Sequence, residues 1–123
     1  MFTTASSFPK FLGHSQRHRS VTCYGREPGG LSGRPITTRV TSFVKHIYQL
    51  AGPKLPIIGV GGIFNAADAY DKIKAGATAV QIYTGWIYEG PGAVKRINAG
   101  LLRLLERDGF KRITEAIGVD VRK

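Results

Sequence analysis

Two glycine-bearing segments follow consecutive apolar runs, at the places where strands would end. They are VGGI at residues 60–63 and YTG at residues 83–85. Glycine at a strand end lets backbone N–H groups point together into a space the size of an anion, and Thr84 adds a hydroxyl. Parallel α/β proteins often hold phosphate in such loops, next to a short helix, and residues 84–88 can form that helix. The spacing suits two tight turns equally well, so both interpretations stay open.

The other reactive side chains form no comparable pattern. His14 and His18 are four residues apart, which suits a metal on a helix, but no carboxylate or thiol stands at a matching spacing. We therefore expect no metal site. Cys23 is the single cysteine, which excludes an internal disulfide and fits a reducing compartment. We assign Cys23 no catalytic role.

The elements that would position the two glycine loops follow an α/β order. Residues 55–60 (LPIIGV) form a near-continuous apolar run, which predicts a strand buried on both faces. Residues 77–83 (ATAVQIY) form a second short run. Between them, Asn65 is a favourable N-cap, the apolar residues share one helix face, and Gly76 ends the helix. This order predicts a βαβ unit in which residues 56–60 and 79–83 are adjacent parallel strands.

Helices are expected on both sides of this unit. Residues 38–51 and 93–108 repeat apolar side chains at helical spacing, and residues 114–117 start a last short turn. The Gly- and Pro-rich residues 28–35 predict a loop. Two strands make no independent sheet, and a complete (β/α)₈ barrel needs roughly 200 residues or more. The sequence therefore predicts an α/β fold that is the C-terminal part of a (β/α)₈ TIM barrel. This incomplete barrel would hold the last two βα units plus the preceding helix.

Composition and charge place limits on the function. The 123 residues include 18 Lys and Arg against 8 Asp and Glu, which gives a net charge of +10. A balance this basic makes nucleic acid or anionic lipid a candidate partner. No run of about 18 apolar residues is present, so no transmembrane helix is expected. Residues 1–26 contain no acid, and their Arg and Ser content indicates either a transit peptide or a disordered or foreign tail.

The glycine loop and its surroundings resemble a known family. The segment IIGVGGIFNAADA at residues 57–69, continued by AGA at 75–77, resembles the second signature of dihydroorotate dehydrogenases. The flanks are similar too: GGLSGRP at 29–35, VQIYTG at 80–85, GP at 90–91 and IGVD at 117–120. The first flank and the GP pair look more like the quinone-dependent, membrane-associated class. The resemblance covers about residues 29–123, and it leaves residues 1–28 as an unmatched basic segment.

The resemblance implies FMN as the cofactor. The two glycine loops would hold its phosphate through backbone N–H groups and one hydroxyl, while the preceding loop and the strand ends would approach the flavin. The implied FMN-binding residues are Ser32, Gly33, Val60, Gly61, Gly62, Ile82, Tyr83 and Thr84. An apolar passage would bring quinone to the flavin. The residues implied to border it are Tyr83, Trp86, Ile87 and Pro91.

The resemblance also implies what the chain lacks. The serine that acts as base in this class, and the lysine and asparagine clusters that hold orotate, lie upstream of every matched motif. No catalytic residue is therefore expected in this chain, and Ser32 matches a flavin contact rather than the base. The family oxidises dihydroorotate to orotate in pyrimidine biosynthesis and passes electrons from FMN to ubiquinone.

The resemblance implies partners and a location as well. Dihydroorotate or orotate, ubiquinone and the missing remainder of the barrel are the implied partners, and no nucleic acid is expected. Membrane association would come only through N-terminal helices that this sequence lacks. Together with the transit-like N-terminus, the resemblance predicts the mitochondrial inner membrane.

Two other functions remain open at the level of sequence. The charge favours a small basic nucleic-acid-binding protein, but aromatic and basic residues do not interleave as in RNA-binding motifs, and no helix-turn-helix or zinc motif is present. An inactive pseudoenzyme that binds flavin or a partner barrel chain is the second alternative. Retained flavin favours the enzyme or the pseudoenzyme, whereas tight, salt-sensitive RNA binding favours the nucleic-acid-binding protein.

Overall fold

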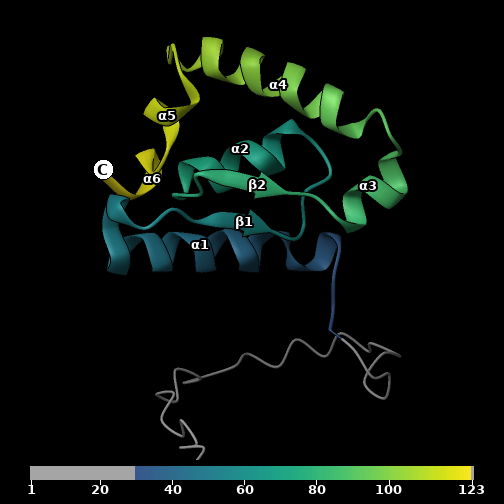
Figure 1. The fold of residues 1–123 in the computed structure, drawn as a ribbon, viewed down its shortest axis with the longest axis horizontal. Coiled ribbons are helices and arrows are strands. Elements are labelled where there is room, and N and C mark those ends of the chain that lie inside the picture. The colour runs from purple at the N-terminus through teal and green to yellow at the C-terminus, as the bar shows by residue number, and fades with distance from the viewer. Residues whose placement is uncertain (1–29, 123) are drawn as a thin grey trace, which may run out of the picture.

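A computed structural model describes residues 30–122 of the chain. The predictions for the N-terminal segment, including the transit-like character, His14, His18 and Cys23, lie outside these residues. Six α-helices, two 3₁₀ turns and two strands make up the described part (Figure 1). In chain order they are η1 (Arg34–Ile36), α1 (Thr37–Ala51), η2 (Gly52–Lys54), β1 (Ile58–Val60), α2 (Ala66–Lys74), β2 (Ala79–Gln81), α3 (Thr84–Glu89), α4 (Ala93–Arg107), α5 (Ile113–Ala116) and α6 (Val119–Arg122).

The central βαβ unit has the predicted connectivity. β1 and β2 pair in parallel, with Ile58 opposite Ala79 and Val60 opposite Gln81, although each strand is shorter than predicted. The side chain of Asn65 caps α2 by accepting the N–H of Asp68 at 2.9 Å. The Asp68 carboxylate in turn accepts the N–H of Phe64 at 3.0 Å. These reciprocal bonds fix where the chain leaves β1 and enters α2.

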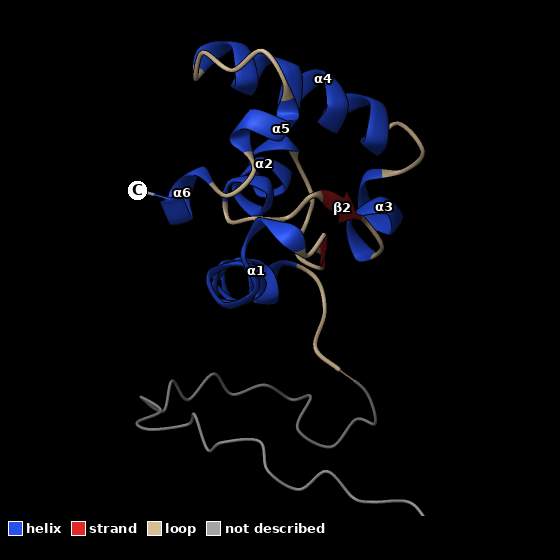
Figure 2. Ribbon diagram, turned by 60° about the vertical axis from the view of Figure 1, so that its left-hand side comes forward, coloured by secondary structure: helices blue, strands red, loops and turns tan. Residues whose placement is uncertain are grey.

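The helices cover only one face of the two strands. In Figure 2, α1 and α2 lie on the same side of the strands, and Gly59 on that side is buried. Ile58 and Val60, on the other side, are 61% and 44% exposed, and Ala79 and Gln81 beside them are exposed too. The prediction that the strand is buried on both faces is therefore wrong for the described chain. We call these four residues, Ile58, Val60, Ala79 and Gln81, the open face.

Two short elements differ from the sequence prediction. Part of the predicted loop at residues 28–35 forms the 3₁₀ turn η1, because Pro35 stands in its first turn with a backbone angle fixed near helical values. Helix α6 was not predicted, because four residues carry no measurable periodicity. It forms where Gly118, at φ +70°, donates its N–H to the Ile73 carbonyl at 3.0 Å.

Tyr48 on α1 joins the C-terminal segment to the base of the βαβ unit. Its ring is 6% exposed and belongs to a cluster with Val44, Ile57 and neighbouring alanines. A Cβ added at Gly76 or at Gly118 would overlap this ring. The two glycines therefore let the end of α2 and the start of α6 approach the same aromatic side chain.

Tyr70 on α2 joins the unit to α4. The side chain is 2% exposed, and its hydroxyl donates to the Asp108 carboxylate at 2.9 Å. Burial, followed by the hydrogen bond to Asp108, raises the pKa of Tyr70 to about 12. Asp108 also accepts from Arg107 at 2.8 Å, and this bond comes first among the causes that lower the pKa of the Asp108 carboxyl.

This arrangement predicts an alkaline titration that Tyr70→Phe removes. The unfolded chain ionises Tyr70 near pH 10 and the folded chain near about 12. In that window the folded state holds one proton more, so the free energy of unfolding falls as the pH rises through it. We expect absorbance at about 295 nm to show an ionisation near the upper value that Tyr70→Phe lacks. Asp108→Asn should lower its midpoint, and a midpoint that persists in Tyr70→Phe would contradict the assignment.

Candidate functional site

Three loops from distant parts of the sequence meet at the carboxyl ends of the strands. The Thr84 hydroxyl donates to the Ser32 hydroxyl at 3.3 Å, which joins residues that are 52 positions apart. Gly33, at φ +82°, is so close that an added Cβ would lie 3.6 Å from Thr84 Cγ2. The third loop contacts the start of α3, because a Cβ at Gly85 would overlap the Ile63 carbonyl oxygen. The structure thus brings together the loops that the sequence singled out.

The glycine pair after β1 is required by the approach of α1. Gly61 and Gly62 adopt φ values of +95° and +65°, which favour glycine. A Cβ added at Gly62 would lie 2.5 Å from the Thr37 Cα, and one at Gly61 would lie 2.9 Å from Ile36 Cδ1. Glycine is therefore needed at both positions whether or not the loop binds a ligand.

The donors and acceptors of the three loops suit an anion. The stretches 30–37, 60–64 and 82–86 contain no Asp or Glu, and Arg34 adds a positive charge. The Gly62 carbonyl is occupied, since it accepts the Thr37 hydroxyl at 2.9 Å. Thr84 and Gly85 open α3, and the first N–H groups of a helix lack acceptors within that helix. The next N–H group, that of Trp86, already donates to the Tyr83 carbonyl at 3.1 Å. The loops themselves therefore present N–H and hydroxyl donors and carry no carboxylate, although the Asp68 carboxylate at the start of α2 accepts the Phe64 N–H at 3.0 Å.

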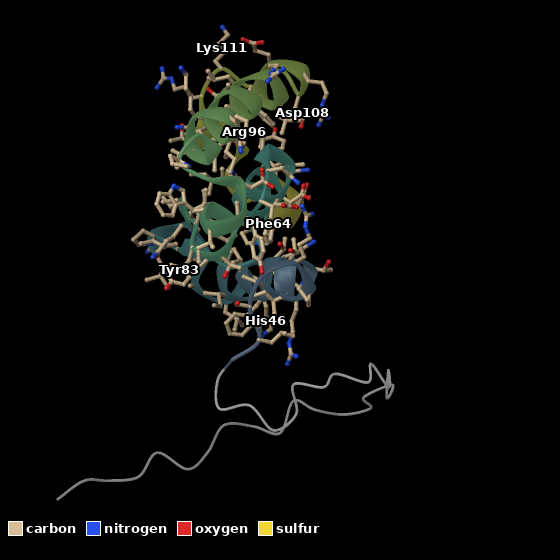
Figure 3. The ribbon with its side chains drawn as sticks, turned by 90° about the vertical axis from the view of Figure 1, so that its right-hand side faces the viewer. His46, Phe64, Tyr83, Arg96, Asp108 and Lys111 are labelled. Carbon is tan, nitrogen blue, oxygen red and sulfur yellow. The ribbon has the colours of Figure 1, made fainter. Side chains whose placement is uncertain are left out.

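The other residues implied to contact FMN occupy different surroundings. Val60 belongs to the open face and directly precedes the glycine pair. Ile82 is half-buried on the helix side, where it packs against a cluster with Ile63 and Ile97. Tyr83 is 74% exposed and lies at the periphery in Figure 3, which looks at the carboxyl ends of the strands. The ring of Tyr83 thus points into solvent, so only its backbone lies at the loop.

The residues implied to border the quinone passage lie on or just after α3. Trp86 and Ile87 are 49% and 64% exposed, and the adjacent Tyr88 is exposed as well. Pro91 follows in the exposed turn before α4. These residues form an exposed apolar surface beside the three loops. Their role toward quinone stays a prediction.

One cavity was not foreseen from the sequence. It has a volume of about 250 Å³ and lies between the loop after β1, the end of α3 and the start of α4. The Arg34 guanidinium lies 4.6 Å from the centre of the Phe64 ring on its wall, and Arg96 pairs with Glu89 at 3.1 Å. Phe64 and Arg96, both labelled in Figure 3, line this cavity. No spacing in the sequence relates these residues, so only the fold reveals the cavity.

Sequence reasoning also missed a buried charge. Lys72 on α2 has no exposed surface, and its ammonium group donates to the Thr41 hydroxyl at 3.1 Å. Burial is the main cause that lowers the pKa of Lys72, with Asp68 and Asp71 opposing it. Its position three residues after the buried Ala69 was the available signal, because residues at that spacing share a helix face.

Residues 30–122 contain neither a membrane-spanning helix nor a metal-binding cluster. No helix there is long and apolar enough to span a bilayer. The same residues hold no group of three or more His, Cys, Asp or Glu side chains placed to bind a metal ion.

Comparison with known proteins identifies the family. The dihydroorotate dehydrogenase family model matches residues 11–105. A quinone dihydroorotate dehydrogenase from Anaeromyxobacter is 56% identical over 96 residues, which are 78% of this chain and 26% of the relative. One from Synechocystis is 56% identical over 95 residues, 77% of this chain and 25% of the relative. The chain thus spans about a quarter of the length of these relatives.

Solved structures agree with the sequence relatives. The ligand-free enzyme from Eimeria tenella gives a TM-score of 0.79 at 40% identity and covers 88% of this chain and 30% of its own. Its complex with ferulenol gives 0.76 at 42% identity, over 80% and 26% of the two chains.

The comparisons overturn the predicted location. The matched relatives include enzymes of Anaeromyxobacter, Synechocystis and Deinococcus radiodurans, which are bacteria and have no mitochondria. The prediction of the mitochondrial inner membrane is therefore wrong, because an Arg- and Ser-bearing, acid-free N-terminus is a compositional signal with no specificity for the organelle. The family model, the relatives and the solved structures agree, and the chain belongs to the dihydroorotate dehydrogenase family.

Proposed function

We propose that residues 30–122 form the closing quarter of a (β/α)₈ barrel and hold the phosphate of FMN in a quinone-dependent dihydroorotate dehydrogenase. The observation that carries the proposal is the convergence of three loops, marked by Ser32, Gly62 and Thr84, at the carboxyl ends of two parallel strands. Phosphate sites of such barrels lie at this end of the last strands. The open face then corresponds to the barrel interior, where strands from the remainder of the protein would cover it.

The chemistry of the loops supports phosphate in particular. Phosphate needs several hydrogen-bond donors and no adjacent carboxylate. The Ser32 and Thr84 hydroxyls and the first N–H groups of α3 are donors, and the loops themselves contain no acid. The nearby Asp68 carboxylate is occupied by the Phe64 N–H. The Thr84 hydroxyl donates to the Ser32 hydroxyl at 3.3 Å, and either hydroxyl can rotate to donate to an anion at the meeting point of the loops.

This chain and the rest of the barrel would have different roles in the reaction. When bound, FMN would supply the redox chemistry that links dihydroorotate to quinone. The described residues would bind and orient FMN, because none of them matches the family's base or its orotate ligands. The exposed apolar surface of α3, with Trp86 and Ile87, supports the proposed approach of quinone from that side. Family membership favours this function over nucleic-acid binding, which rested on net charge alone.

The test uses a hybrid in which residues 30–122 replace the matching segment of a bacterial quinone dihydroorotate dehydrogenase. We expect Thr84→Val to weaken FMN binding about tenfold to a hundredfold, because it removes one hydrogen bond to a charged group. Riboflavin lacks the phosphate, so its affinity should not change. Fluorescence titration of both flavins measures the two dissociation constants.

Tyr83→Phe serves as the control in the same hybrid. The Tyr83 ring is exposed, so removing its hydroxyl should leave the affinities for FMN and riboflavin unchanged. Gly62→Val is a poorer probe, since its side chain would collide with the backbone of Thr37 and disturb the fold directly. Equal losses for FMN and riboflavin in Thr84→Val, or no loss for either, would refute the phosphate site.

A further inference from the structure

The Gly61–Gly62 loop is tied to α1 by a single side chain. Thr37, the first residue of α1, donates its hydroxyl to the Gly62 carbonyl at 2.9 Å. The two segments are 25 residues apart in sequence, and an added Cβ at Gly62 would lie 2.5 Å from the Thr37 Cα. Thr37 therefore forms a hydrogen bond to the loop where the backbones of Thr37 and Gly62 are in such close contact that only glycine fits at residue 62.

Further hydrogen bonds fix the backbone of Thr37 from the interior. One turn along α1, the Thr41 hydroxyl donates to the Thr37 carbonyl at 2.9 Å. Thr41 in turn accepts the ammonium group of Lys72 at 3.1 Å. These two bonds end at the Thr37 backbone carbonyl, so Thr41 and Lys72 hold the first turn of α1, on which the Thr37 hydroxyl stands. The Thr41 hydroxyl accepts from Lys72 and donates to Thr37, and a hydroxyl polarised in this way makes the stronger bond to the Thr37 carbonyl.

Lys72 forms its hydrogen bond to Thr41 from a buried position, without a carboxylate partner in the described residues. Its side chain has no exposed surface, and the stem is so close to β1 that a Cβ at Gly59 would lie 3.3 Å from Lys72 Cδ. Within residues 30–122 its ammonium group forms no salt bridge. Isolated burial of an ammonium group is unfavourable, so a contribution to stability alone does not account for lysine here.

We propose that Thr37, supported by Thr41 and Lys72, is a positioning residue that fixes the orientation of the glycine loop for phosphate. The inference rests on the proposed function, since it assigns these residues to the same FMN site. Holding the Gly62 carbonyl against α1 turns it away from the meeting point of the loops, where an acceptor would repel the anion. The donors therefore stand ready before the ligand arrives.

Hydrogen–deuterium exchange of the full 123-residue chain, without ligand, tests the anchor. In Thr37→Val, we expect a peptide spanning residues 60–64 to exchange about threefold to tenfold faster, the range set by one hydrogen bond. Thr37→Ser keeps the hydroxyl and should restore the slow rate. Lys72→Met keeps the apolar stem and removes the donor, and it should accelerate the same peptide by about twofold while the helix content measured by circular dichroism stays constant.

Three exchange results would overturn the anchor. They are a wild-type rate in Thr37→Val, a Thr37→Ser variant as fast as Thr37→Val, and a Lys72→Met variant with the wild-type rate. A structural role alone predicts that Thr37→Val speeds exchange throughout α1 and β1, and not selectively in the loop. Selective acceleration of the loop, with rescue by serine, supports the proposal.

Flavin binding by the hybrid enzyme separates this inference from the proposed function. We expect Thr37→Val to weaken FMN about threefold to tenfold and to leave riboflavin unchanged, with Thr37→Ser close to wild type. A wild-type hybrid that binds both flavins equally would refute the phosphate site and the role given to Thr37. A wild-type hybrid that prefers FMN, with the same preference in Thr37→Val, would refute the anchor alone.

Discussion

Gly85→Ala is expected to unfold the start of α3 and to lower the free energy of unfolding by about 3 kcal/mol or more. The added methyl group would overlap the Ile63 carbonyl oxygen, which belongs to the backbone and cannot rotate away. Relief requires the loop after β1 and the helix to separate, and this separation would also open the proposed phosphate site. Trp86 is the next residue and the single tryptophan, so its fluorescence during urea unfolding reports the change.

Two other glycines provide matched controls for this substitution. A Cβ at Gly30 would meet nothing within 4 Å, and Gly30 has no positive φ, so Gly30→Ala should leave the urea midpoint unchanged. Gly90 also faces open space but has φ +74°, so Gly90→Ala should cost about 1 kcal/mol through the backbone alone. A Gly85→Ala midpoint equal to that of Gly90→Ala would show that the contact with Ile63 is unimportant.

The second large effect concerns self-association of the chain. Ile58 and Val60 expose apolar side chains on the open face, and an uncovered sheet face with unpaired edges is a template for association. We expect the chain to self-associate at micromolar concentration, and Ile58→Glu to weaken this association at least about tenfold, because the interface would bury a charge. Sedimentation velocity across a dilution series measures the effect.

Leu102→Glu is the control for that experiment. Leu102 is 62% exposed and Ile58 is 61% exposed, so the two substitutions add the same charge at equal exposure. Leu102 lies on α4, away from the strands, and its variant should associate as the wild type does. A wild-type chain that stays monomeric across the series, or equal effects of the two variants, would contradict the assignment of the open face.

Elements set by short-range patterns could be predicted from the sequence. The apolar runs indicated the two parallel strands, and Asn65 indicated the start of α2. The helical spacing at residues 38–51 and 93–108 predicted α1 and α4 to within a residue at each end. The burial of the strands could not be predicted from the same runs. A run without alternation indicates that both faces are apolar, but the cover of each face depends on segments outside the run.

The sequence pointed to the residues of the candidate site, but not to the tertiary contacts that require glycine there. Glycine at 61 and 62 was visible in the sequence as a loop able to approach an anion. The structure adds that Ile36 and Thr37 fill the space where side chains would be. Tertiary contacts of this kind leave no spacing to detect, and the same holds for the cavity beside Phe64. From the sequence, Lys72 could be recognised only as a lysine on the apolar side of its helix, and its hydrogen bond to Thr41 could not be predicted.

The two edges of the sheet differ from each other. β1 and β2 run in the same direction, and each pairs with one neighbour in the part of the chain described by the structure. Two copies related by a two-fold axis would pair like edges in antiparallel fashion. A parallel continuation instead joins the β1 edge of one copy to the β2 edge of the next, head to tail, and leaves the same two edges free. Such growth stops only when a ring closes. An assembly built this way is therefore a series of sizes with no preferred dimer.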